Sequence, residues 1–439
     1  MQLIRSLVTF LAIIFSSFCL MLNHFAWANN SHQNAIEEEN MVVENNSAFA
    51  LNDPFALIDP LVKGNTNFAL DLYAQLTENN SGNLFFSPYS ISTALAMTYA
   101  GARENTATQM SSVLHFPQQQ AELHTAFHHL QNDVAQAQKD IELRIANALW
   151  GQEKYPFLPN FKDEVKKYYN AALTEVDFTT AAEDIRKKIN AWVENQTNDK
   201  IKELVKSGII TQLTRLVLVN AIYFKGKWAS PFKKNDTRKA SFWVTDNKSI
   251  EVPMMTQKQY FKYMENDSLQ GLELPYFGNS PSMNPYEKNH ISMIVLLPQQ
   301  RDGLANVEES LKKNLDDCSQ QLHPQKIKVF LPKFKINTGF ELSDTLSSMG
   351  MPDAFSDKAD FSGIDGKKQL SLTSVIHQAF VDVNEEGTEA AAATAVFATT
   401  RGMPPPTPIF RADHPFIFLI RHNDSGSILF MGRVVNPTR

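Results

Sequence analysis

Hydrophobic residues recur at helical spacing in the first half of the chain. Residues 61–76 and 91–98 carry apolar side chains every three to four positions, and the second run directly follows Ser87 and a proline. This spacing places apolar side chains on one helix face, so it predicts two early helices. The pattern around Trp192 predicts one or two further helices within residues 183–206.

Strand patterns dominate the second half. Apolar residues alternate in residues 141–145 and 327–331, whereas residues 216–223 and 293–297 are nearly continuous apolar runs. Residues 416–435 predict two strands separated by the turn-forming sequence Asn-Asp-Ser-Gly. Early helices followed by many strands indicate an α+β architecture.

The first residues have the pattern of an export signal. Arg5 is positively charged, residues 7–22 are largely apolar, and residues 26–28 read Ala-Trp-Ala. Polar residues interrupt the apolar run, which is shorter than the ~20 residues of a membrane-spanning helix. The sequence therefore predicts a signal peptide over residues 1–28, a secreted or periplasmic protein, and no membrane association after removal of the signal.

Composition narrows the function further. The chain has 439 residues, 43% of them hydrophobic, and a formal net charge of −6, so it is globular and has no overall basic field that attracts nucleic acid. Residues 29–53 are Asn-rich and acidic and predict a flexible leader before one folded domain over residues 54–439. After loss of the signal, Cys318 is the only cysteine, and we expect it to be a small buried side chain.

Common enzyme motifs are absent from the sequence. It contains no G-x-S-x-G, H-E-x-x-H, Walker or G-x-G-x-x-G pattern. His124 and His128 lie four residues apart on a predicted helix, a spacing that can share a metal, but no third ligand accompanies them. We therefore expect a solvated helix face, no metal, no cofactor and no enzyme activity.

One segment between two apolar strands has an unusual composition. Residues 385–394 have little side-chain bulk, and residues 403–408 are rich in proline. Consecutive alanines favour a surface helix followed by a polyproline linker, whereas Gly387 and Thr388 weaken a helix. The local sequence leaves a surface helix and an exposed loop as alternatives.

Ordered motifs over most of the chain resemble the serpin family. They run from about residue 54 to the C-terminus: residues 83–91 (NLFFSPYSI), 220–228 (NAIYFKGKW), 346–355, 377–390 and 410–416. The resemblance implies one domain with three β-sheets, eight or nine helices and an exposed reactive-centre loop. It also implies that a protease attacks this loop, and that the first half of the loop then inserts into the main sheet before the acyl-enzyme is hydrolysed.

The hinge implied by the resemblance can form a strand with one uncharged face. Alternation places Thr388, Ala390, Ala392, Thr394 and Val396 on the inward face and Glu389 on the outward face. The hinge comprises Glu385, Glu386, Gly387, Thr388, Glu389, Ala390, Ala391, Ala392, Ala393 and Thr394. Because the inward-facing residues are small or β-branched and uncharged, the hinge favours an inhibitory over a non-inhibitory serpin.

The resemblance also places the reactive bond. The family's spacing from Glu385 assigns it to Arg401–Gly402, and a long cation suits a protease pocket that holds a carboxylate. We expect a monomer that forms a covalent 1:1 complex with a trypsin-like serine protease. An Arg-specific cysteine protease as target, and a non-inhibitory carrier, storage protein or chaperone, are the alternatives.

Further residues are implied to control insertion. A hydrogen-bonded cluster lies beneath the strands that open, and an aromatic side chain lies at the insertion point; these gating residues are Ser87, Ser90, Asn220, His377 and Trp228. Residues 104–138 contain no Lys or Arg, so activation by sulfated polysaccharides through this region is not expected.

Overall fold

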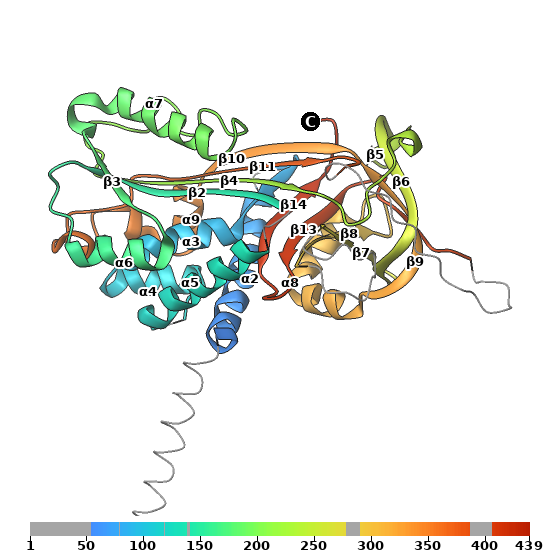
Figure 1. Ribbon diagram of the computed structural model, residues 1–439, viewed down its shortest axis with the longest axis horizontal. Helices are drawn as coiled ribbons and strands as arrows, with labels where there is room; N and C mark the ends of the chain where they lie inside the picture. Colours follow the sequence, from blue (N-terminus) through green and yellow to red (C-terminus); the bar gives the residue numbers. More distant parts are fainter. Residues whose placement is uncertain (1–53, 79, 118, 138–140, 278–289, 387–405) are drawn as a thin grey trace, which may run out of the picture. The chain divides into compact units, whose positions relative to one another are not determined.

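A computed structural model of the chain places helices mainly in its first half and strands mainly in its second half (Figure 1). Residues 58–439 form one compact unit. The structure describes residues 54–78, 80–117, 119–137, 141–277, 290–386 and 406–439.

The two early helices are confirmed as α2 (Pro54–Glu78) and α3 (Pro88–Tyr99). α3 begins where its sequence favours a helix start, because Ser87 Oγ accepts the Ser90 N–H at 3.1 Å and a proline occupies the first helical position. The remaining α-helices are α4 (Glu104–Val113), α5 (Gln120–Gln136), α6 (Pro159–Tyr169), α7 (Phe178–Gln196), α8 (Leu304–Gln321), α9 (Ser343–Met349) and α10 (Ser362–Asp365).

A five-stranded sheet lies between helices. Figure 1 shows α7 on one face of this sheet and α3 on the other. The central strand is buried on both faces, which explains its continuous apolar sequence. The strand order is β10 (Phe334–Glu341), β11 (Val375–Val383), β4 (Leu216–Gly226), β2 (Ile141–Gln152) and β3 (Leu173–Val176).

The other described strands form one nine-stranded sheet. The long strand β6 (Lys248–Glu265) pairs with three neighbouring strands. These pairings connect the strands outside the five-stranded sheet into one hydrogen-bonded sheet. The order is β1 (Leu84–Phe86), β14 (Ile428–Val434), β13 (Phe416–His422), β8 (Ile291–Pro298), β7 (Leu269–Pro275), β6, β9 (His323–Pro332) and β12 (Ile409–Arg411), with β5 (Arg238–Thr245) beside β6. The α+β class is confirmed.

Two local expectations need correction. The one or two helices expected within residues 183–206 are a single helix, α7, which ends at Gln196; Asn198 and Asp199 then take positive φ angles of 50° and 60° that a continuing helix does not tolerate. His124 does not lie on a solvated face: it is buried, and its Nδ1 contacts the Tyr169 hydroxyl at 2.5 Å. Burial lowers the pKa of His124 to about 4.

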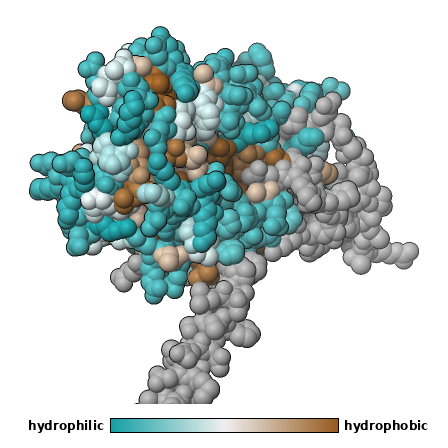
Figure 2. All heavy atoms as spheres, turned by 60° about the vertical axis from the view of Figure 1, so that its left-hand side comes forward, coloured by the Kyte–Doolittle hydropathy of each residue, from teal (hydrophilic) through white to brown (hydrophobic). Residues whose placement is uncertain are grey.

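The surface of the described part is mainly polar. Figure 2 shows a hydrophilic face with scattered hydrophobic patches. Among the described residues, Leu213 and Ile409 are the exposed large apolar side chains, at 82% and 51% exposure. No helix within this part is both long enough and apolar enough to cross a membrane.

Candidate functional site

The five-stranded sheet contains a parallel pair at its centre. β11 lies directly against β4, in a register that runs from Val375 opposite Leu218 to Val381 opposite Phe224. We call this pairing the β4/β11 seam. A chain that leaves the end of β11 and turns back would run antiparallel to β11, and therefore also antiparallel to β4. The seam could thus exchange one parallel ladder for two antiparallel ladders, which are slightly more stable per residue.

A buried side-chain hydrogen bond bridges the seam. His377 on β11 lies opposite Asn220 on β4, and His377 Nδ1 is hydrogen-bonded to Asn220 Oδ1. The Ser87 backbone N–H donates to His377 Nε2 at 3.1 Å. Since a backbone N–H can only donate, Nε2 is the acceptor and Nδ1 carries the proton. Burial lowers the pKa of His377 to about 3, so the ring is neutral at physiological pH.

The same cluster reaches α3 and two more strands. The Asn220 amide donates to the Ser90 carbonyl at 2.9 Å and to Asn147 Oδ1 on β2. Ser87 Oγ donates to the Leu429 carbonyl on β14 at 2.6 Å. The structure therefore brings together Ser87, Ser90, Asn220 and His377, which the sequence had grouped. It adds Asn147, whose position directly opposite Asn220 depends on the β2/β4 register.

Trp228 lies where the chain leaves β11. Its indole Nε1 donates to the Asn384 carbonyl at 2.9 Å, and its ring stacks on Tyr276 with centroids 4.5 Å apart. The indole therefore holds the residue that directly precedes the predicted hinge.

The first hinge residue is anchored by side chains from two connections that are distant in the sequence, one just before β5 and one between β9 and β10. Glu385 is buried; its carboxylate pairs with Lys333 Nζ at 2.8 Å and accepts the Thr237 hydroxyl at 2.9 Å. Burial alone would raise the pKa of Glu385, but the hydrogen bonds from Lys333 and Thr237 lower it below its ordinary value. Glu385 is thus an ionised anchor. Sequence reasoning missed Lys333 and Thr237, which carry no local signal for this contact.

The second hinge residue is also held. Glu386 forms an ion pair with Lys234, and its backbone N–H donates to Asn384 Oδ1 at 3.0 Å. The other hinge residues, Gly387–Thr394, and the bond Arg401–Gly402 lie outside the described residues. Their assignment remains a prediction.

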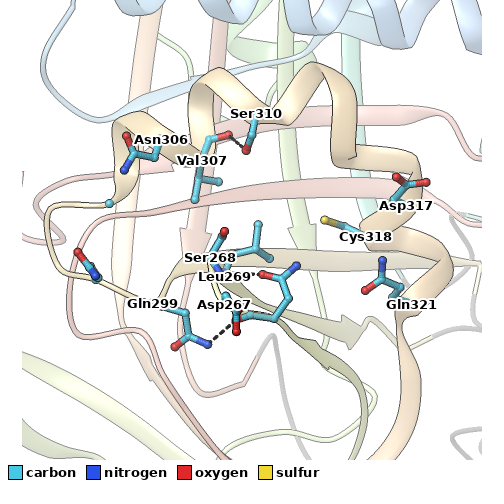
Figure 3. Close-up of a pocket in the computed structure, with 13 residues that line it drawn as sticks. Asp267, Ser268, Leu269, Gln299, Asn306, Val307, Ser310, Asp317, Cys318 and Gln321 are labelled. Carbon is cyan, nitrogen blue, oxygen red and sulfur yellow. Dashed lines mark hydrogen bonds between the residues drawn. The ribbon is translucent and has the colours of Figure 1, made fainter.

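A cavity of about 400 Å³ lies elsewhere, between α8 and two neighbouring turns (Figure 3). Cys318 lines it, as a buried side chain whose thiol pKa is raised by burial. The other lining residues are Asn266, Asp267, Ser268, Leu269, Gln299, Gln300, Gly303, Asn306, Val307, Ser310, Asp317 and Gln321. Of the predicted site residues that the structure describes, none lines this cavity. Within the described ranges, no three His, Cys, Asp or Glu side chains are grouped to hold a metal ion.

The chain matches known proteins over most of its length. The family model described as "Serpin (serine protease inhibitor)" matches residues 63–437. The leukocyte elastase inhibitors of Bos taurus and Homo sapiens are each 44% identical, over 86% of this chain and 99% of the relative. Human serpin B3 is 41% identical with the same coverage.

Solved structures agree with this match. Uncleaved ovalbumin has a TM-score of 0.76 and 32% identity, covering 87% of this chain and 100% of that chain. Serpin48 of the insect Tenebrio molitor, described as highly specific, has a TM-score of 0.74 and 33% identity, covering 86% and 98%. The fold is therefore the serpin fold.

The prediction of a secreted or periplasmic protein is wrong on this comparison. The matching leukocyte elastase inhibitors and serpins B3 and B4 are intracellular serpins without a signal peptide. The predicted signal peptide over residues 1–28 lies outside both the family match and the described residues. The prediction rested on a short compositional pattern, whereas the relatives match across the folded domain.

Proposed function

This chain belongs to the serpin family, and we propose that it inhibits Arg-specific, trypsin-like serine proteases by inserting its cleaved loop into the β4/β11 seam. Residues 54–439 act as one inhibitory domain that is not itself an enzyme. The observation that supports this most is the parallel pairing of β4 and β11 directly beside an anchored hinge.

The reaction begins as ordinary acyl transfer. The protease serine attacks the carbonyl carbon of Arg401, the bond to Gly402 breaks, and the amine of Gly402 leaves with the C-terminal fragment. Arg401 stays esterified to the protease. Residues 387–396 then enter the seam as a strand and carry the esterified protease with them before water can hydrolyse the ester.

The energy of insertion is large enough to distort a protease. A new central strand adds on the order of ten backbone hydrogen bonds, each contributing about 1 kcal/mol net. Protease stability is typically about 5–15 kcal/mol. Insertion can therefore supply free energy comparable with that needed to disorder an active site.

Both ends of the uncut loop are held, which delays insertion. Glu385 and Glu386 are anchored at one end, and β12 is paired with β9 at the other, with Ile409 opposite Lys328. Cleavage at Arg401 separates the part of the loop that follows Glu386 from the part that leads into β12. The His377–Asn220 hydrogen bond keeps the seam closed until then.

Incubation with trypsin tests the proposal. We expect a 1:1 complex that survives SDS, together with a released fragment that begins at Gly402. Arg401→Glu should abolish this complex, because the carboxylate in the trypsin pocket repels an acidic side chain. Clean cleavage of the wild-type chain without a complex would favour a non-inhibitory serpin.

Two other protease classes sharpen the result. The matching relatives are named for leukocyte elastase, and elastase pockets accept small side chains. A complex with leukocyte elastase but not with trypsin would contradict the assignment of Arg401. A complex with an Arg-specific cysteine protease alone would keep the bond but change the target class.

Strand register offers a matched pair of variants. Ala392→Arg places a charge on the predicted inward face, whereas Ala391→Arg places it on the outward face. We expect trypsin to cleave both variants but only Ala391→Arg to retain a stable complex. Equal trapping by the two variants would refute the proposed register.

A further inference from the structure

A group of cations lies beside the strand that follows the loop. In the strand register, Lys258 on β6 is opposite Lys328 on β9, and Lys328 is opposite Ile409 on β12. Lys326 and Arg411 lie two residues along their strands from these positions, so all five side chains share one face. We call Lys258, Lys326, Lys328, Ile409 and Arg411 the basic face.

Among the described residues, no carboxylate forms an ion pair with a cation of the basic face. The three lysines are exposed, and no ion pair of the described residues involves them or Arg411. Lys262, further along β6, does pair with Glu273 at 3.2 Å. Arg411 instead stacks on the Phe330 ring at 3.7 Å, and Lys328 lies 5.0 Å from the same ring.

Such an arrangement costs stability in the isolated chain. Like charges directly opposite each other on neighbouring strands are destabilising. The protein as a whole has a net charge of −6, so this group of positive charges contrasts with the rest of the chain. Ile409 adds an apolar side chain that is 51% exposed, opposite Lys328 and two residues from Arg411. An exposed apolar residue with a charged rim is typical of a protein interface.

The basic face lies within reach of a protease held at the loop. The Lys328 backbone N–H donates to the Pro408 carbonyl at 3.0 Å, so the end of the loop is fixed beside this face. Arg401 is eight residues before Ile409. Eight extended residues span at most about 28 Å. A protease of ~230 residues is about 45 Å across, so a protease bound at Arg401 is large enough to reach this face.

We propose that the basic face is a second recognition surface for the target protease, and that this target carries acidic residues beside its active site. The proposal rests on the proposed function and adds the surface chemistry of the partner. Lysines on an exposed strand face steer an oppositely charged partner toward productive encounters, and salt weakens this steering. Ile409 would then be covered in the encounter complex.

An anionic and a cationic trypsin separate charge from specificity, because both cleave after Arg. We would measure the second-order rate constant of covalent complex formation with each at low and high salt. The wild-type chain should react about tenfold faster with the anionic enzyme at low salt, and the preference should shrink at high salt. The double variant Lys258→Glu, Lys328→Glu should lose this preference.

A matched control changes the same charge elsewhere. Lys187→Glu with Lys188→Glu alters two exposed lysines of α7 and should leave the preference intact. Complexes that form equally fast with both trypsins at low salt would overturn the inference while leaving the proposed function standing. Acceleration of both trypsins by a sulfated polysaccharide, lost in the Lys258/Lys328 variant, would overturn it in favour of a polyanion site. Absence of any complex would overturn both proposals.

Discussion

Different interactions hold neighbouring strands together in the two sheets. In the nine-stranded sheet, β13 pairs antiparallel with both β8 and β14, and Phe418 is fully buried against Phe85 and Phe334 at centroid distances of 5.6 and 5.3 Å. In the five-stranded sheet, a parallel pair is bridged by the neutral polar bond between His377 and Asn220.

This difference bears on which sheet can open. Separating β13 from its neighbours exposes large apolar surface, at a cost of about 25 cal/mol per Å². Separating β4 from β11 breaks hydrogen bonds that an incoming strand can replace one for one. We therefore expect the nine-stranded sheet to stay intact during inhibition and the five-stranded sheet to accept a new strand.

Cleavage of the loop should have the largest effect. If residues 387–396 enter the seam, about 10 kcal/mol of added hydrogen bonding should raise the unfolding temperature by about 10 °C for a domain of this size. Scanning calorimetry of the intact chain and of a chain nicked at the loop measures this difference. Equal unfolding temperatures would mean that the seam does not accept the strand, and that the two sheets do not differ in the way described.

Phe418→Ala tests the sheet that persists. Removal of a fully buried phenylalanine should cost about 3–5 kcal/mol and lower the unfolding temperature of the intact and the nicked chain by the same amount. Leu213→Ala is the control, because this side chain is 82% exposed and should change neither. A lower unfolding temperature in the intact chain alone would contradict the expectation that the nine-stranded sheet is the same before and after cleavage.

Local patterns predicted the elements but not the contacts that close the site. Ser87 was recognisable because the hydroxyl before a proline is a helix-start signal, and β4 because its apolar run is continuous. Lys333 and Thr237 could not be assigned to Glu385, since the contact forms only when segments far apart in the sequence pack together. His124 was misjudged for the same reason: Tyr169 of another helix covers it.

Asn220→Ala tests the sheet that opens. The substitution leaves the buried His377 Nδ1–H without the Asn220 oxygen that accepts it, at a cost of about 1–3 kcal/mol. We expect a lower unfolding temperature in the intact chain and faster spontaneous loop insertion, followed by native gel electrophoresis. Asn337→Ala on β10 is the matched control, since this asparagine is exposed in the same sheet. Equal effects of the two substitutions would show that the buried cluster does not hold the seam.

Acidification should have a smaller effect, through His377. An unfolded histidine binds its proton near pH 6.5, whereas burial lowers the pKa of His377 to about 3. Between these values the unfolded chain holds more protons, so stability falls as the pH is lowered through this window. Each such group contributes about 1 kcal/mol per pH unit below 6.5.

The window from pH 6.5 to 5 isolates the histidines, because Asp and Glu titrate mostly below it. Protonated His377 would also point a new N–H at the Ser87 N–H, so acid should loosen the seam itself. His377→Gln, which does not titrate, should flatten the pH dependence of both unfolding temperature and loop-insertion rate. His124→Gln should flatten only the first, because His124 is also buried and neutral but lies on α5, away from the seam. An insertion rate equally sensitive to acid in the wild-type chain and in His377→Gln would show that this histidine does not control the opening of the sheet.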